Sequence, residues 1–267
     1  MGLKYDTIND IMNMKLVKRL CLRATPTLMM AGLLGLSAFA SDGAKERVAF
    51  VCAHPDDFGG ISGTGMLLAE KYDVHVIDYT HGERGLGEEG YRDGSVRKMR
   101  TAEEENACKV AGVTLHWLEE IDGEASAGME TCKKLAALLK EIGPRAVILH
   151  WPVDTHNDHV MSSAASLRAI QLAGLKPEVY FQEQHHQSRS YRPVLYVDIT
   201  PVKARKDQLI GCYKCQWPDK MVIRKTADAK AYGVEVGMEF AETLAPMGGT
   251  VSLDKCIFTA LRSVKVR

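Results

Sequence analysis

Apolar and polar residues follow a regular pattern along this chain from residue 47 onwards. Short runs rich in β-branched and aromatic residues predict strands, and they cover residues 47–53, 74–79, 113–117, 146–150, 177–181 and 194–198. Longer stretches carry Leu, Ala, Val and Met at helical spacing, over residues 61–71, 95–111, 126–141 and 158–172. Beyond residue 200 the pattern becomes helical, and we expect helices over 203–216 and 228–244.

The repeated order of strand, helix and strand predicts an α/β fold with a Rossmann-like, mainly parallel sheet. Right-handed crossovers place helices on both faces of such a sheet. No internal repeat, low-complexity tract or linker interrupts the pattern, so we expect a single domain over residues 41–267. In sheets of this kind, ligands bind beyond the carboxyl ends of the strands.

Residues 1–40 have the three parts of a secretory signal peptide, preceded by an N-terminal extension. Basic residues between Lys15 and Arg23 come before the apolar core 28–36, and Ala38-Phe39-Ala40 forms a small-x-small site. The core is short for a membrane span. We therefore expect cleavage after Ala40, a periplasmic or secreted protein, and no stable membrane anchor after cleavage; the alternative is an uncleaved anchor.

Composition narrows the class of partner only slightly. The chain has 34 basic and 34 acidic residues without a block of like charge, which argues against nucleic acid or an anionic membrane as the main partner. Cys212 and Cys215 have the spacing of a redox motif, but they fall in an expected helix and have no second pair for a zinc site. Nothing in the composition indicates an oligomeric state.

Two clusters of His and Asp follow predicted strands. Ala53-His54-Pro55-Asp56-Asp57 comes directly after the apolar run 48–52. Residues 150–159 follow the apolar run 146–149 and contain His150, Asp154, His156, Asp158 and His159. Both clusters therefore belong at the carboxyl edge of the sheet, which is how a mononuclear metal hydrolase site is usually assembled.

The residue types in these clusters match the needs of a catalytic zinc ion. Such an ion takes three protein ligands from His, Asp or Glu and keeps one position for water. His54, Asp57 and His159 supply a set of this kind, and Asp56 remains free beside them as a general base.

A further candidate catalytic residue lies just before the helix predicted over residues 158–172. His156 lies three residues before His159, on the same helical face if the helix begins near Asp158. It is placed to stabilise an oxyanion or to protonate a leaving group, with Asp158 setting its protonation. Alternatively, Asp158 caps the helix.

At these residues the chain resembles the PIG-L or LmbE-like zinc-dependent N-acetylglucosaminyl deacetylases. The matching motifs occur in the family's order over about 46–245, and they are Ala53–Asp57, Thr80-His81-Gly82-Glu83, Arg100 with Glu103, Gly112-Val113, Asp122-Gly123 and His156–His159. Weaker matches occur at Gln216 and at Phe240-Ala241-Glu242. The first and last motifs together are specific, whereas the others alone are weak.

The resemblance implies one zinc ion per chain on His54, Asp57 and His159, or another divalent metal in its place. It also implies Asp56 as general base and His156 as its electrostatic or acid partner.

Three further positions concern the substrate. Arg100 and Asp122 match positions that contact sugar hydroxyls, although Arg100 suits an ordinary surface ion pair with Glu103 or Glu104 equally well. The family's first motif usually continues with Glu, and here the residue is Phe58. We expect Phe58 to offer an aromatic wall for a sugar or an acyl group.

The function expected from these residues is hydrolysis of the N-acetyl amide of an amino sugar or glycoconjugate, a small-molecule substrate. The loops 81–95 and 183–191 are expected to shape its pocket. One alternative is a catalytically impaired metal- or carbohydrate-binding protein on the same scaffold, which Phe58 favours. Another is a dinucleotide-binding oxidoreductase, but the glycines in 59–65 lack the Gly-x-Gly-x-x-Gly order.

The signal-peptide hypothesis predicts where the mature chain begins. Protein recovered from the exported fraction should start at Ser41, because signal peptidases cut after the small-x-small site. Amino-terminal sequencing checks this. A mature protein that retains residues 28–36 would instead indicate an uncleaved anchor.

Overall fold

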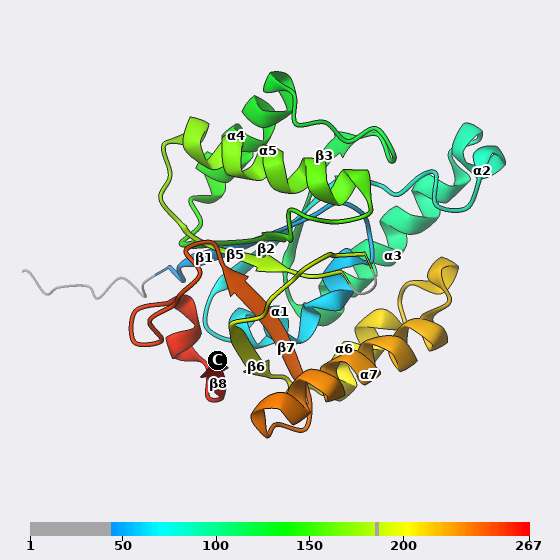
Figure 1. The fold of residues 1–267 in the computed structure, drawn as a ribbon. Helices are drawn as coiled ribbons and strands as arrows, with labels where there is room; N and C mark the ends of the chain where they lie inside the picture. Colours follow the sequence, from blue (N-terminus) through cyan, green and yellow to red (C-terminus); the bar gives the residue numbers. More distant parts are fainter. Residues whose placement is uncertain (1–43, 185–186) are drawn as a thin grey trace, which may run out of the picture. The chain divides into compact units, whose positions relative to one another are not determined.

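The computed structural model describes residues 44–184 and 187–267 (Figure 1). The predicted extension and signal peptide lie outside the described residues. The described residues form one compact unit. Among the helices that the structure describes, none combines the length and apolarity needed to span a membrane.

The described residues form an eight-stranded sheet with the strand order β3-β2-β1-β4-β5-β7-β6-β8. The strands are β1 (Arg47–Cys52), β2 (Asp73–Thr80), β3 (Thr114–Glu120), β4 (Ala146–His150), β5 (Glu178–Gln182), β6 (Leu195–Asp198), β7 (Ala241–Pro246) and β8 (Val264–Val266). The strands β3, β2, β1, β4 and β5 are parallel to one another, and β7 pairs antiparallel with both β5 and β6. The predicted α/β fold with a mainly parallel sheet is therefore confirmed.

Helices cover both faces of this sheet (Figure 1). They are α1 (Ser62–Ala69), α2 (Glu88–Arg92), α3 (Ser95–Ala111), α4 (Met129–Ile142), α5 (Asn157–Ala173), α6 (Lys203–Ile210) and α7 (Pro218–Val236). The pair α4 and α5 packs on one face, while α1, α3, α6 and α7 lie on the other. The four helices predicted before residue 200 are present as α1, α3, α4 and α5.

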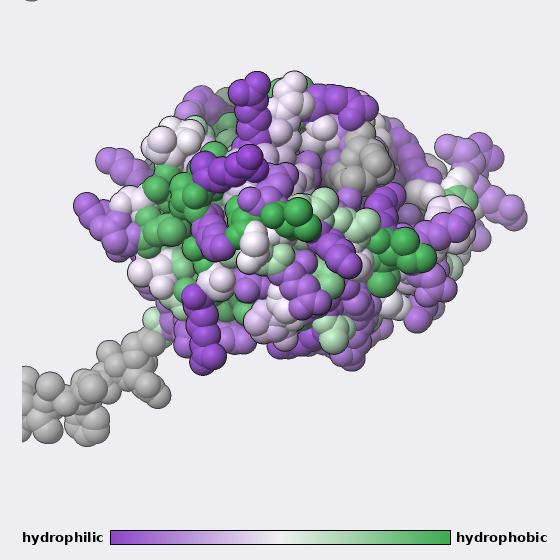
Figure 2. Space-filling view, turned by 60° about the horizontal axis from the view of Figure 1, so that its bottom comes forward, coloured by the Kyte–Doolittle hydropathy of each residue, from purple (hydrophilic) through white to green (hydrophobic). Residues whose placement is uncertain are grey.

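Alternate residues of β1 belong to two separate hydrophobic cores. Val48, Phe50 and Cys52 pack beneath α1, α3 and α6, whereas Ala49 and Val51 pack beneath α4 and α5. A strand buried on both faces in this way reads as a continuous apolar run. On the face of the molecule shown in Figure 2, hydrophilic residues surround smaller groups of apolar residues.

The C-terminal part of the predicted pattern is wrong in two places. The helix predicted over 228–244 ends at Val236, because Gly237 adopts a left-handed φ of 68° that terminates α7. The following residues Ala241–Pro246 form β7, buried along its whole length between β5 and β6. The helix predicted over 203–216 ends at Ile210, and Lys214–Gln216 forms a separate 3-10 turn.

The predicted aromatic wall at Phe58 is also wrong, because this side chain is fully buried. Its ring packs edge-on against that of Phe50, with ring centroids 5.3 Å apart. Gly65 of α1 lies directly against it, since a Cβ atom on that glycine would come within 2.6 Å of the Phe58 ring. Phe58 therefore joins β1 to α1 as part of the core and has no surface to offer a substrate.

Two carboxyl groups are buried beneath the carboxyl ends of the strands. Asp78 of β2 and Glu104 of α3 are both fully buried. Glu104 accepts hydrogen bonds from the Asp56 backbone N–H and the Cys108 thiol, whereas neither oxygen of Asp78 has a partner among the described residues. Burial raises the pKa of Glu104 to about 7 and raises that of Asp78 well above its usual range.

The core position of Phe58 predicts a large effect on stability. We expect Phe58→Ala to lower the free energy of unfolding by about 3–5 kcal/mol, because it leaves a cavity between β1 and α1. Denaturation in urea measures this. The control is Ile223→Ala on the outer face of α7, where the side chain is 71% exposed, and the expected change there is within about 0.5 kcal/mol.

The buried Glu104 predicts a pH dependence of stability. Its ordinary pKa is 4.5 and its folded value is about 7, so between these values the folded protein binds more protons than the unfolded chain. Stability should therefore fall as the pH rises through this window. We expect Glu104→Gln to flatten that slope, as measured by urea denaturation at several pH values. An unchanged slope would show that Glu104 titrates normally.

Candidate active site

The turn after β1 is closed by the side chain of Asp57. Its Oδ2 atom accepts hydrogen bonds from the backbone N–H groups of Ala53, at 3.1 Å, and His54, at 2.9 Å. Within the turn, Asp56 has a left-handed backbone with φ of 93°, which is costly for a residue other than glycine. Burial by itself would raise the pKa of Asp57, but the nearby His159 and His150 hold it well below its usual range.

The start of α5 positions two histidines of the second cluster, residues 150–159. The imidazole Nδ1 of His156 caps this helix by accepting the backbone N–H of Asp158 at 3.2 Å. One turn later, His159 Nδ1 donates to Asp154 Oδ1 at 3.1 Å, which leaves Nε2 directed away from Asp154. That Nε2 atom lies 3.5 Å from Asp57 Oδ1. Against the opposing effect of burial, Asp57 and Asp154 raise the pKa of His159 to about 9.

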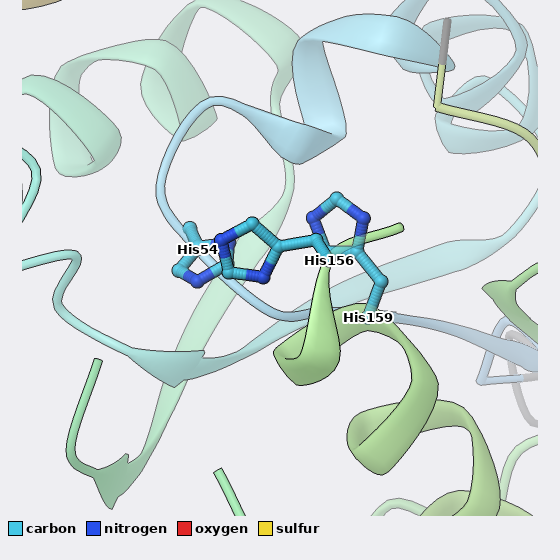
Figure 3. A group of neighbouring side chains, drawn as sticks. All are labelled: His54, His156 and His159. Atoms are coloured by element: carbon cyan, nitrogen blue, oxygen red, sulfur yellow. The ribbon is translucent and has the colours of Figure 1, made fainter. Parts of the chain in front are cut away.

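The three predicted ligands come together at this point. His54 Nδ1 lies 3.5 Å from Asp57 Oδ2, and the His54 and His159 rings are 5.4 Å apart between centroids. Figure 3 shows the rings of His54, His156 and His159 gathered between the turn after β1 and the start of α5. Donor atoms of these three histidines lie within 4.8 Å of one another, as do those of Asp57, His150 and His159.

This donor set fits a divalent metal ion. Imidazole nitrogens and a carboxylate oxygen are the ligand types of catalytic zinc. The groups that orient them are also present, since Asp154 holds the outer nitrogen of the His159 ring, and such contacts fix the orientation of a metal-binding histidine. The residues at the two strand ends therefore suit a metal centre in their chemistry and in their convergence.

The side chain of Asp158 faces His54 instead of the His156 ring. Its Oδ2 atom lies 3.1 Å from His54 Nε2 and accepts the backbone N–H of Gly123 at 2.7 Å. Asp122 Oδ1 lies 3.3 Å from the same nitrogen. Burial lowers the pKa of His54, but Asp122 and Asp158 outweigh it and raise the value well above its usual range. The helix cap is His156, so the alternative in which Asp158 caps α5 through its side chain does not hold.

Helix α3 contributes a buried cation to the site. The guanidinium of Arg100 donates to the carbonyl oxygens of Pro55 and Gly82 and lies 3.0 Å from Asp56 Oδ1. Because Arg100 is only 5% exposed, the surface ion pair considered for it is wrong. Burial raises the pKa of Asp56 to about 6, although the positive charge of Arg100 opposes this rise.

An open cavity of about 340 Å³ lies over these groups. It is lined by His54, Asp56, Asp57, Arg84, Gly85, Arg100, Asp122, His156, His159, Gln187 and Gln216. The predicted sugar contacts Arg100 and Asp122 are among them, and their role toward a substrate stays a prediction. Of the segment 183–191, Gln187 reaches the cavity, whereas His185 and His186 lie outside the described residues.

Sequence reasoning gave no role to His150. This residue ends β4, stacks on the His159 ring at 4.3 Å between centroids, and places Nε2 3.2 Å from Asp57 Oδ2. Its Nε2 atom also accepts the Ala53 backbone N–H at 3.0 Å. The sequence signal for a role of His150 was its position directly after the apolar run 146–149. Only the pairing of β1 with β4 shows that it lies behind Asp57.

Comparison with known proteins identifies related sequences. The sequence pattern of the PIG-L family, described as GlcNAc-PI de-N-acetylase, matches residues 49–170. The chain is 31% identical over 188 residues to 4-oxalmesaconate hydratase of Pseudomonas putida, a match that covers 63% of this chain and 73% of that protein. It is 28% identical over 160 residues to 1D-myo-inositol 2-acetamido-2-deoxy-alpha-D-glucopyranoside deacetylase of Thermobispora bispora, covering 49% of this chain and 53% of that relative.

Solved structures share the fold. GalB, the 4-carboxy-2-hydroxymuconate hydratase of Pseudomonas putida KT2440, aligns with a TM-score of 0.70 and 24% identity, over 78% of this chain and 98% of its own. N,N'-diacetylchitobiose deacetylase of Pyrococcus horikoshii aligns with a TM-score of 0.67 and 23% identity, over 77% of this chain and 85% of its own. With the sequence matches and the strand-end clusters, these findings show that the chain is an enzyme of the PIG-L family.

Proposed function

We propose that this enzyme is a zinc-dependent hydrolase that removes the N-acetyl group from an amino sugar or glycoconjugate, acting outside the cytoplasm. The observation that carries the proposal is the position of Asp56, a cavity-lining carboxylate directly beside the convergent groups of His54, Asp57 and His159. The description of the family and the deacetylase relative of Thermobispora bispora support the same reaction.

The ligands proposed for the metal are His54, Asp57 and His159, and they would hold one zinc ion or another divalent ion. When bound, this ion polarises the carbonyl group under attack and acidifies water. The remaining requirements of amide hydrolysis fall to side chains around it: a base, a donor for the developing oxyanion and a proton for the leaving amine.

Asp56 suits the role of the base. Its pKa of about 6 leaves it ionised at neutral pH while making it a stronger base than an exposed aspartate. The guanidinium of Arg100 lies 3.0 Å from Asp56 Oδ1 and thereby orients the Asp56 carboxylate. In the proposed reaction Asp56 takes a proton from water as the C–O bond forms, and it returns this proton to the amine nitrogen as the C–N bond breaks.

His156 suits the role of the oxyanion donor. Because its Nδ1 accepts the backbone N–H of Asp158, the neutral ring carries its proton on Nε2. Burial lowers the pKa of His156, and the neighbouring His54 and His159 add to this effect. A neutral imidazole with its N–H available to the cavity stabilises the negative charge that develops on the carbonyl oxygen.

A hydratase is the second candidate, and the 31% identity to 4-oxalmesaconate hydratase favours it. Hydration adds water across a carbon–carbon double bond, and it needs a base as well. The cavity contains Arg84 and Arg100, and guanidinium groups bind the carboxylates of unsaturated dicarboxylic acids well. The two candidates therefore differ in substrate, which makes a direct comparison of the two activities decisive.

The two alternatives raised by the sequence have less support. Phe58 was the argument for an impaired binding protein, and this residue belongs to the core. The dinucleotide hypothesis needs a free helix N-terminus for the pyrophosphate. At α1 the Glu242 carboxylate already accepts the N–H groups of Gly63 and Thr64, at 3.0 and 2.6 Å.

The proposal predicts that Asp56→Asn abolishes deacetylation. Acetate release from a panel of N-acetylated sugars should fall about 10²- to 10⁴-fold, because the amide cannot take a proton from water, while zinc content stays unchanged. Removal of zinc by chelation should abolish release as well. Asp254→Asn, an exposed change of the same chemistry, serves as the control and should leave the rate unaltered.

Two outcomes would contradict this assignment. Acetate release that persists in Asp56→Asn would remove Asp56 as the base. If the wild-type protein released no acetate but hydrated 4-oxalmesaconate, followed by the loss of ultraviolet absorbance, the hydratase candidate would replace the deacetylase.

A further inference from the structure

A buried glutamine lies behind the predicted metal ligand Asp57. Gln184 follows β5 and is 5% exposed. Its Nε2 atom donates to the Asp57 backbone carbonyl at 3.1 Å, and its Oε1 atom accepts from Lys225 Nζ of α7 at 3.3 Å. Because an ammonium group only donates, Lys225 determines which end of the amide faces it. The N–H end of Gln184 is therefore held toward Asp57.

The backbone of the same glutamine reaches the second predicted ligand. Gln184 N–H donates to Ser188 Oγ at 2.9 Å, and Ser188 Oγ donates to Asp154 Oδ2 at 2.8 Å. The other oxygen of Asp154 accepts from His159 Nδ1 at 3.1 Å. A continuous path of hydrogen bonds thus joins Asp57, on the turn after β1, to His159, on α5, through the chain that leaves β5.

Lys225 also packs against the turn itself. A Cβ atom on Gly60 would lie 3.1 Å from Lys225 Nζ and 3.5 Å from Gln184 Oε1. Lys225 is only 8% exposed, and burial lowers its pKa, as do the charges of Lys206 and Arg224, whereas Asp228 and Asp57 oppose this change. Burying an ammonium group costs free energy unless the group is hydrogen-bonded. The bond to Gln184 Oε1 therefore matters for keeping Lys225 next to the Asp57 turn.

We propose that Gln184 and Lys225 are positioning residues of the metal centre: Lys225 orients the Gln184 amide, and Gln184 fixes Asp57 relative to His159. This inference rests on the proposed function, since it takes Asp57 and His159 as metal ligands. A pair that only filled space in the core would affect stability, but it would not couple to metal affinity.

The test is a double-mutant cycle read out as zinc affinity. Zinc ions alone are titrated into metal-free wild-type, Gln184→Met, Lys225→Met and double-mutant protein, in competition with a chelator. Gln184→Met should weaken zinc binding about tenfold, the lower end of the range for groups that contact ligand residues. Lys225→Met should weaken it less. In the double mutant the loss should equal that of Gln184→Met, because Lys225 acts through the glutamine.

The control is Lys230→Met, which removes the same charge from an exposed position of α7 and should leave zinc affinity unchanged. Thermal unfolding of the metal-free proteins separates stability from affinity. If Lys225→Met does not fold, Gln184→Met alone decides, since it removes no charge. If the wild-type protein binds zinc and Gln184→Met binds it with the same affinity, this inference is overturned and the proposed function stays intact. If the wild-type protein binds no zinc, both are overturned.

Discussion

The site depends on the Asp57 carboxylate, which satisfies the N–H groups left free where β1 ends. By accepting from Ala53 and His54, it folds the turn back so that His54 and Asp57 face the start of α5. This geometry forces Asp56 into a left-handed backbone, a strain of about 1–3 kcal/mol. Arg100 and Glu104 of α3 hold the strained residue from the other side, so the turn is held by contacts from distant segments.

The second constraint is charge. Several carboxylates and imidazoles share a small buried region, and each charged group would be costly there without partners. The structure compensates by pairing: Asp56 with Arg100, His54 with Asp122 and Asp158, and His159 with Asp154. The proposed divalent cation would add to this compensation at the point where the Asp57 oxygens face His54 and His159. The site is therefore one network, in which the orientation of each imidazole and carboxylate depends on its charged neighbours.

The fold supports more than one chemistry. Hydratases and deacetylases both occur among the proteins that this chain resembles, as expected where function is carried by residues placed on a common scaffold. The parallel strands bring His54, Asp56, Asp57 and His159 to one edge of the sheet. Arg84 and Gln187, which line the cavity, lie on loops that follow β2 and β5.

The sequence by itself determined the five parallel strands, the four helices that cover them and the convergence of His54, Asp57 and His159, because apolar periodicity and strand-end position are local properties. It failed at β7, because the buried Glu242 and Thr243 interrupt the apolar run that marks the other buried strands. It also misplaced Phe58, whose burial depends on the close approach of Gly65. Only the tertiary structure decided the groups that support the ligands, since the contacts of His150 with Ala53 and of Gln184 with Asp57 and Lys225 join segments far apart in the chain.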